Sequence, residues 1–229
     1  MSDPDAYITL ITSLPSSERL FVAKQPPLSR IRLDRRLSVL TQEDAETLRR
    51  IEALLSWSAY DRQSDLGTLI HRAKDLLADL DQPTLRAIVA ERMELRSAVA
   101  ALRMRYAGRP APSEPWGFGR WTAHIAAHWS DPAFGLDGSL PWLREAGQLL
   151  ENGDTLGLQR HLLDVTERQL RRHAARHQFD FEAVVIYVLK WNIFDRWAKA
   201  DSAAAAQRFS ELSEDALKNF PQLQSEGAM

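Results

Sequence analysis

Apolar residues recur at intervals of three and four positions along much of the chain, which is the spacing of one buried face on an α-helix. The first such segment follows Thr41, and Asp44 three positions later completes a pattern typical of a helix N-terminus. The apolar positions of this segment and the next are Leu48, Ile51, Leu54 and Leu55, then Leu66, Leu69, Ile70, Ala73, Leu76 and Leu77. The sequence predicts one helix after Thr41 and another from about Ser64.

A long helix is predicted to begin at Pro83, because proline is pre-shaped for a first helical position, and to run to Tyr106 before Gly108. Residues 108–119, GRPAPSEPWGFG, are rich in proline and glycine and predict a linker. Further helices are expected at about 120–130, 140–151, 154–176, 180–199 and 203–219. The predicted fold class is all-α. It is a multi-helix bundle that could divide into two helical subdomains, at 1–107 and 120–229.

The N-terminal segment differs from the rest of the chain. Residues 7–15, YITLITSLP, are β-prone and end in Ser-Leu-Pro, so they are expected to form a short strand or an extended entry segment. No basic region precedes them, which argues against a secretory signal.

The most apolar stretch is FDFEAVVIYVLKWNIFDRW, residues 179–197. A membrane span needs roughly 20 mostly apolar residues, and this stretch is interrupted by charged side chains, so a buried or docking helix is expected instead. One helical stripe stays apolar, whereas another becomes polar toward the end. Two interpretations remain open: a plain core helix, or a helix whose far end forms a partner-binding surface. The residues of that surface would be Trp191, Asn192, Asp195, Arg196 and Lys199.

The composition excludes several functional classes. The 229-residue chain has no cysteine, which excludes disulfides, thiolate catalysis and cysteine-ligated zinc. Lysine and arginine number 29 against 31 acidic residues, so bulk affinity for nucleic acid is not expected. A cytoplasmic protein is predicted. Because the net charge is small, a charged partner would have to bind to a local patch of opposite charge.

One basic patch is evident in ERQLRRHAARH, where Arg168, Arg172 and Arg176 share a helical stripe. Basic helices can grip phosphates, but this one carries no aromatic residue on which a base could stack. A solvated face, salt bridges to acidic neighbours and a protein-docking patch remain as alternatives.

His124 and His128 lie four positions apart in HIAAH and could face one metal ion on a helix. Ile125 occupies the position at which the metalloprotease pattern has its glutamate, and no third ligand follows at a telling spacing. The pair is therefore a weak candidate for a metal site, and a packing role is favoured. The sequence carries no phosphate loop and no Gly-x-Ser-x-Gly pattern, so neither an enzyme nor a cofactor is predicted.

Several segments resemble known proteins. FDFEAVVIYVLKWNIFDRW resembles the Phe-Asp-…-Ala-Tyr-Leu-Leu-Lys pattern of one central-stalk component of V/A-type rotary ATPases, which is named C in the archaeal and bacterial enzymes and d in the eukaryotic enzyme. ERMELRSAVAALRMRYAG is similar to the Asp-x-x-Asn-Leu-x-x-x-Leu-Arg helices of this C/d component, with Glu94, Leu95, Leu102 and Arg103 in comparable places. YITLITSLP, with QPPLS and LTQEDAETL, resembles a short uncharacterised family encoded alongside bacterial V-type ATPase genes. The chain departs from the C/d component in its shorter length and in Glu94, which replaces the asparagine.

The resemblance implies a non-catalytic, all-α subunit or accessory that links the rotor shaft to the membrane proteolipid ring. Its implied partners are the rotor and proteolipid subunits, and it would lie peripherally at the inner face of the cytoplasmic membrane without spanning it. Two alternatives stay open: a stand-alone helical scaffold or regulatory protein-binding module, and a metal-dependent enzyme that uses His124 and His128.

Overall fold

The computed structural model describes residues 4–16, 25–56, 66–113 and 116–219, and within these ranges the regular structure is helical throughout. The predicted all-α fold is therefore confirmed. The α-helices are α1 (Pro4–Ser13), α2 (Arg30–Leu37), α3 (Gln42–Leu55), α5 (Leu66–Asp79), α6 (Pro83–Tyr106), α7 (Thr122–Ala127), α8 (Trp142–Glu151), α9 (Thr155–Ala174) and α10 (Phe181–Asn219), and η1 (Pro132–Gly135) is a short 3-10 helix.

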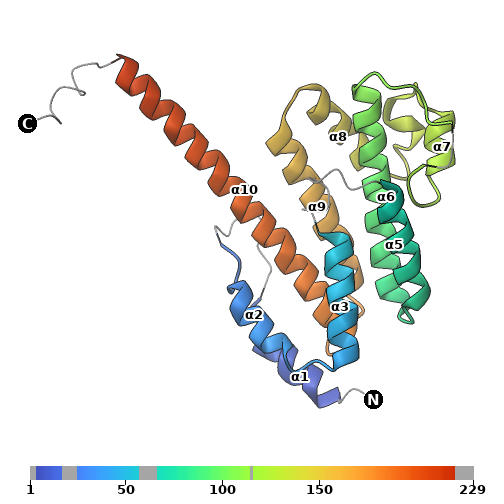
Figure 1. The fold of residues 1–229 in the computed structure, drawn as a ribbon, viewed down its shortest axis with the longest axis vertical. Coiled ribbons are helices and arrows are strands. Elements are labelled where there is room, and N and C mark those ends of the chain that lie inside the picture. Colours follow the sequence, from blue (N-terminus) through green and yellow to red (C-terminus); the bar gives the residue numbers. More distant parts are fainter. Residues whose placement is uncertain (1–3, 17–24, 57–65, 114–115, 220–229) are drawn as a thin grey trace, which may run out of the picture.

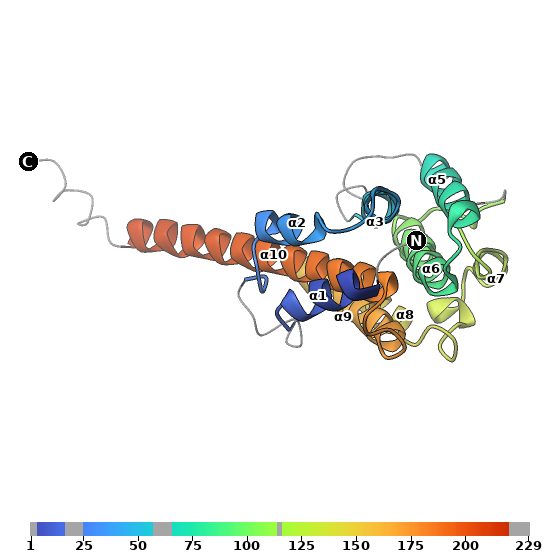
Figure 2. The same ribbon diagram turned by 90° about the horizontal axis from the view of Figure 1, so that it is seen from below.

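The helices are arranged around three long elements, α6, α9 and α10 (Figures 1 and 2). Helices α9 and α10 pack side by side and run antiparallel, and α1 and α2 cover α10 from the other side. Helices α5, α7 and α8 surround α6. The C-terminal part of α10 continues well beyond the bundle in both views.

Two hydrophobic cores lie along this framework. The first joins α1, α2, α3 and α5 to the N-terminal half of α6 and to α10, and the second joins the C-terminal half of α6 to α7, α8 and part of α9. The boundary between the two cores falls within one turn of α6, because Met93 belongs to the first core and Leu95 to the second. Both cores thus draw on residues from each side of segment 108–119. The division into subdomains at 1–107 and 120–229 stays a prediction.

The N-terminal segment is the first correction. Residues 7–15 were expected to be extended, but Pro4–Ser13 is the α-helix α1. Tyr7 and Leu10 are buried, and Ile11 and Leu14 pack against the same core. These positions have helical spacing, and contact with α10 overrides the β-propensity of the isoleucine and threonine residues.

Helix α2 was not predicted. Ser29 caps it by accepting a hydrogen bond from the backbone N–H of Arg32, and its buried residues are only Leu33 and Leu37. Only Leu33 and Leu37 of the three apolar residues in this charged segment have helical spacing, and this weak periodic signal is why the helix was missed.

The predicted cap of α3 is confirmed, because the Thr41 hydroxyl accepts from the Asp44 N–H at 3.1 Å. Helix α6 spans Pro83–Tyr106 as predicted. The expected start of α5 near Ser64 lies outside the described residues. The predicted break between 199 and 203 is wrong, because α10 continues without interruption to Asn219. No proline or glycine stands within that helix, and the alanines at 203–206 favour its continuation.

The described part of segment 108–119 folds back onto α6. The N–H of Phe118 donates to the Ser97 hydroxyl at 2.6 Å, and the N–H of Arg120 donates to the Glu94 carboxylate at 3.2 Å. Gly119 between them has a φ of 97°, a left-handed conformation that glycine adopts without strain. Beyond it, the helix expected at 120–130 is shorter, because α7 ends at Ala127 and η1 follows.

Tyr187 links α10 to the chain after α1, since its hydroxyl donates to the carbonyl of Pro15 at 3.0 Å. Burial raises the pKa of Tyr187 to about 12, and nearby Arg36 offsets part of this effect. A tyrosine in the unfolded chain titrates near pH 10, so the folded state holds this proton more tightly. The stability from Tyr187 is therefore complete below about pH 10 and is lost as the pH rises through about 12.

We expect tyrosinate absorbance of the folded protein to include a component with a pKa of about 12 that Tyr187→Phe removes. Tyr106→Phe, at an exposed tyrosine, is the control and should leave this component in place. Identical high-pH titrations of the parent and Tyr187→Phe would contradict the expectation.

Candidate functional site

A cleft of about 480 Å³ lies between α3, α6 and α10, with Arg30 of α2 at its edge. Its walls combine charged side chains with a few apolar ones. The lining residues are Arg30, Arg49, Glu52, Ala53, Leu55, Ser56, Arg92, Leu189, Asn192, Ile193, Asp195, Arg196 and Lys199. Four of them, Asn192, Asp195, Arg196 and Lys199, belong to the partner-binding surface predicted from the sequence. We call this feature the cationic cleft.

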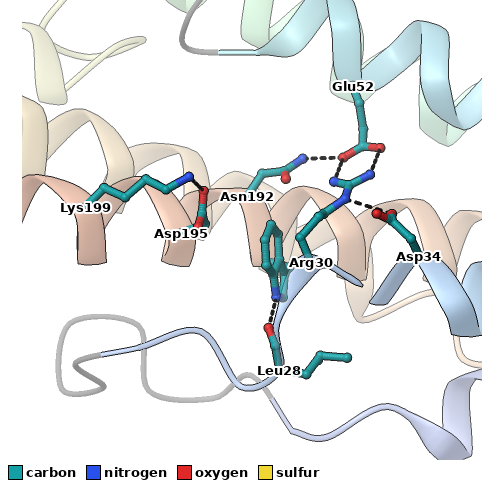
Figure 3. A network of polar contacts seen from close by, with 8 residues as sticks. Leu28, Arg30, Asp34, Glu52, Asn192, Asp195 and Lys199 are labelled. Atoms are coloured by element: carbon teal, nitrogen blue, oxygen red, sulfur yellow. Dashed lines mark hydrogen bonds and ion pairs between the residues drawn. The ribbon is translucent and has the colours of Figure 1, made fainter. Parts of the chain in front are cut away.

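One wall of the cationic cleft is a hydrogen-bonded network (Figure 3). Glu52 of α3 accepts two bonds from the Arg30 guanidinium, at 2.7 and 3.0 Å, and one from the Asn192 amide at 2.8 Å. Arg30 also donates to Asp34 at 2.8 Å. The hydrogen bond with Glu52 raises the pKa of Arg30, an effect that its burial partly opposes. The network joins α2, α3 and α10 at one point.

The interior side of the cationic cleft is lined by Arg92 of α6, and Arg96 lies one turn further along the same helix. The sequence analysis did not single out either arginine. Arg92 and Arg96 are only 4% and 2% exposed. Arg96 donates to the carbonyls of Leu54 and Ser56, at 2.6 and 2.7 Å, and so binds the C-terminal end of α3, where carbonyls lack helical partners. Burial, and then the charge of Arg96, lower the pKa of Arg92 to about 9. Arg92 therefore remains protonated at neutral pH.

The expectation that Trp191 emerges on the surface is wrong. Its side chain is 4% exposed, and its indole N–H donates to the carbonyl of Leu28 at 2.8 Å. The guanidinium of Arg30 lies 5.7 Å from the centre of the ring. Trp191 therefore fastens the segment before α2 to α10, as a core residue does.

The polar residues that follow Trp191 are more accessible. Asn192, Asp195 and Arg196 are partly buried, whereas Lys199 is exposed and pairs with Asp195 at 2.6 Å. The structure therefore brings these four residues together along the cationic cleft, without the exposed aromatic residue that was expected among them.

The basic patch Arg168, Arg172 and Arg176 is exposed on α9 and just beyond its end. Arg168 pairs with Asp164 at 2.7 Å, and Arg172 lies 3.7 Å from Glu91 of α6. The expected alternative of salt bridges to acidic neighbours is thus observed for two of the three arginines. Arg168 and Arg172 also line a second cleft of about 350 Å³, beside α6 and α8.

The basic patch and the cationic cleft lie at different levels of the α9–α10 pair. Lys190 of α10 lies 3.8 Å from Glu167 of α9, and Arg160 of α9 lies over the ring of Trp197 at 5.6 Å. The antiparallel pairing places the C-terminal end of α9 beside the beginning of α10. The structure therefore separates two sets of residues that the sequence analysis proposed as alternative docking surfaces.

His124 and His128 face each other on α7 and the residue that follows it. Their rings are stacked with centroids 4.0 Å apart. His124 Nε2 lies 3.1 Å from the carbonyl of Phe134, and His128 Nδ1 lies 2.9 Å from the carbonyl of His124, so each of these nitrogens donates a hydrogen bond. Among the residues that the structure describes, this pair does not gather a third His, Asp or Glu ligand. The contacts are those of packing and local capping.

One other group in the described ranges has the spacing of metal ligands: His177, Asp180 and Glu182, whose ligand atoms lie within 4.8 Å of one another. Both ring nitrogens of His177 are already engaged, one with Asp180 at 2.7 Å and the other with Thr84 at 2.9 Å. Asp180 also accepts from the Ala183 N–H at 2.9 Å. These contacts hold the residues at the beginning of α10 in place, so the grouping of the three side chains has a structural explanation without a metal.

No helix in the described part of the chain is long and apolar enough to cross a membrane. No protein-family model matches the chain, and searches of curated proteins and of solved structures also find no match. The likeness to the C/d component of V/A-type ATPases stays a prediction from the sequence.

Proposed function

We propose that the chain is a non-catalytic helical subunit or accessory of a V/A-type rotary ATPase, which contacts the rotor shaft and the proteolipid ring through protein surfaces. It would act at the inner face of the cytoplasmic membrane. The observation that carries the proposal is the length of α10, which continues beyond the bundle (Figures 1 and 2).

Residues 200–219 of α10, here called the arm, follow the part of the helix that belongs to the core. At 1.5 Å per residue they extend for about 30 Å. An isolated helix of this length is marginally stable in water, because most helical stability in proteins comes from packing of an apolar face. Such a helix gains stability when it docks on a partner.

The sequence of the arm suits docking. Phe209, Leu212 and Ala216 recur at intervals of three and four, which in a helix places them on one face. A single apolar stripe of this kind is the pattern with which helices pair in coiled coils and grooves. The helical shaft of a rotary ATPase would be a partner of matching form.

A second surface supports a linking role. The basic patch of Arg168, Arg172 and Arg176 lies at the end of α9, beside the beginning of α10, whereas the arm is the other end of α10. A basic patch beside the beginning of α10 and an arm at its other end suit a protein that holds two partners at once.

The test is affinity purification of the tagged chain from detergent-solubilised native membranes, followed by mass spectrometry. We expect proteolipid and rotor-shaft subunits to be recovered with the parent chain. The double substitution Phe209→Asp, Leu212→Asp should reduce their recovery to background, because it places two carboxylates in the apolar stripe. The matched control, Gln207→Asp with Ser210→Asp, adds the same charge at the same spacing but away from the stripe, and should retain them.

Recovery of soluble proteins alone would replace the proposal with the stand-alone scaffold. Recovery of the ATPase subunits with both double variants would support the association with the ATPase but show that the arm is not the contact. Failure of the parent chain to recover any ATPase subunit would overturn the proposal.

A further inference from the structure

The outer side of α2 combines exposed apolar side chains with exposed arginines. Ile31 is 75% exposed, and Val39, in the turn that follows the helix, is 56% exposed. Arg32 and Arg35 lie between them in the sequence and are also exposed. Ile31 and Arg35 are four positions apart and so share one side of the helix, opposite its two buried leucines. We call Ile31, Arg32, Arg35 and Val39 the α2 face.

The arginines of the α2 face are not neutralised within the described part of the chain. The only acidic residue of α2, Asp34, pairs with Arg30. Among the residues that the structure describes, Arg32 and Arg35 form no ion pair, and their guanidinium groups donate no hydrogen bond. The helix dipole favours a cation such as Arg35 in the last turn of α2, but it leaves the full charge at the surface. The α2 face therefore carries uncompensated positive charge.

We propose that the α2 face docks on an anionic lipid surface. The planar guanidinium groups of Arg32 and Arg35 bind pairs of phosphate oxygens, which lipid headgroups supply in a continuous layer. Beside them, Ile31 and Val39 enter the apolar zone just beneath the headgroups, which removes from water two side chains that the fold leaves exposed. Helix α2 lies at the outside of the bundle in both views, where a flat surface can reach it (Figures 1 and 2).

The composition of this segment favours lipid over other anionic partners. Residues 30–40 contain no aromatic residue, so a nucleobase would find no stacking surface there. A protein interface would commonly be anchored by tryptophan or tyrosine in addition to arginine. The net charge of the whole chain is −2, so attraction to an anionic surface must come from a local patch of this kind. The inference is independent of the ATPase assignment, because it concerns direct contact between the chain and lipid.

The experiment is co-sedimentation of the purified full-length chain with vesicles. One set consists of phosphatidylcholine alone, and the other contains phosphatidylcholine and phosphatidylglycerol in equal amounts. We expect binding to the anionic vesicles only, and weaker binding as salt is added, because salt screens exposed charges. Arg32→Gln with Arg35→Gln should weaken the binding about tenfold or more, since each arginine near an anionic surface contributes about fivefold. The matched control, Arg72→Gln with Arg109→Gln, removes the same charge from exposed positions on α5 and after α6 and should leave the binding unchanged.

A fluorescent label tests the place of contact without altering the arginines. Because the chain has no cysteine, Ile31→Cys provides a single site for an environment-sensitive fluorophore. Its emission should shift to the blue when anionic vesicles are added. The same label at Ser130→Cys, an exposed position after α7 and far from α2 in both views, should not respond.

Absence of binding to the anionic vesicles, or equal binding to the neutral ones, would overturn the proposal. Unchanged binding in the double variant at Arg32 and Arg35, or an equal loss in the matched control, would do the same. A label response at position 130 with none at position 31 would place the contact elsewhere and also overturn it. Binding of poly(U) RNA without binding of vesicles would assign the α2 face to nucleic acid instead. The vesicles contain no ATPase subunit and these variants leave the arm intact, so the two proposals fail separately.

Discussion

Replacement of Trp191 by alanine is expected to lower the free energy of unfolding by about 3–5 kcal/mol, the usual cost of removing a large buried aromatic side chain. Trp191 is 4% exposed in the first core, so the substitution leaves a cavity between α10 and the segment before α2. It also leaves the carbonyl of Leu28 without the indole N–H that it accepts from at 2.8 Å. Urea or guanidinium denaturation, monitored by circular dichroism, measures the change.

Two companion variants divide this effect into its parts. Trp191→Phe keeps an aromatic ring and loses the hydrogen bond, so a loss of about 1–3 kcal/mol is expected. Lys199→Ala, on the same helix, removes only an exposed pair with Asp195 and should cost less than about 1 kcal/mol. If Trp191→Ala were as stable as Lys199→Ala, Trp191 would not be a core residue and the interpretation as a partner contact would return.

The sequence predicts those parts of the fold that depend on local signals. Helix α6 is predicted correctly because Pro83 marks its start and Gly108 follows its end. The cap at Thr41 is also predicted correctly, because Thr41 and Asp44 form a local signal for the start of a helix. Helix α1 is not predicted correctly, because its residues have both a high β-propensity and the spacing of a helix. Only the contact with α10 determines that this segment is a helix and not a strand.

The cationic cleft could be predicted only in part. Asn192, Asp195, Arg196 and Lys199 share one stretch of α10, so their polarity at the end of an apolar helix is visible in the sequence. Their partners come from elsewhere: Glu52, for example, is 140 positions from Asn192. Pairings at that separation depend on how the helices pack, and a single sequence does not contain them.

The error at Trp191 has the same origin. A tryptophan beside Asn192 on a helix that is becoming polar fits an interface anchor and a core residue equally well. The segment before α2, which covers it, follows two prolines and has no periodic pattern of its own. Its position against α10 is a tertiary effect, held by the contacts of Leu28 and Arg30 with the indole.

The second large effect is expected at Arg96, where substitution by methionine should lower the free energy of unfolding by about 3 kcal/mol. Arg96 is 2% exposed and donates to the carbonyls of Leu54 and Ser56 at the C-terminal end of α3. Each hydrogen bond from a charged group contributes about 1.5–3 kcal/mol, and methionine supplies neither. Relief of the repulsion with Arg92 offsets part of the loss.

For a chain of 229 residues, a loss of this size corresponds to a decrease of about 6–12 °C in the melting temperature, which scanning calorimetry measures. Arg96→Lys should be intermediate, because a single ammonium cannot reproduce the planar fork that reaches both carbonyls. Arg103→Met makes the same change at an exposed position of α6 and should stay within about 0.5 kcal/mol of the parent. If Arg96→Met melted at the same temperature as Arg103→Met, the end of α3 would not depend on the Arg96 guanidinium.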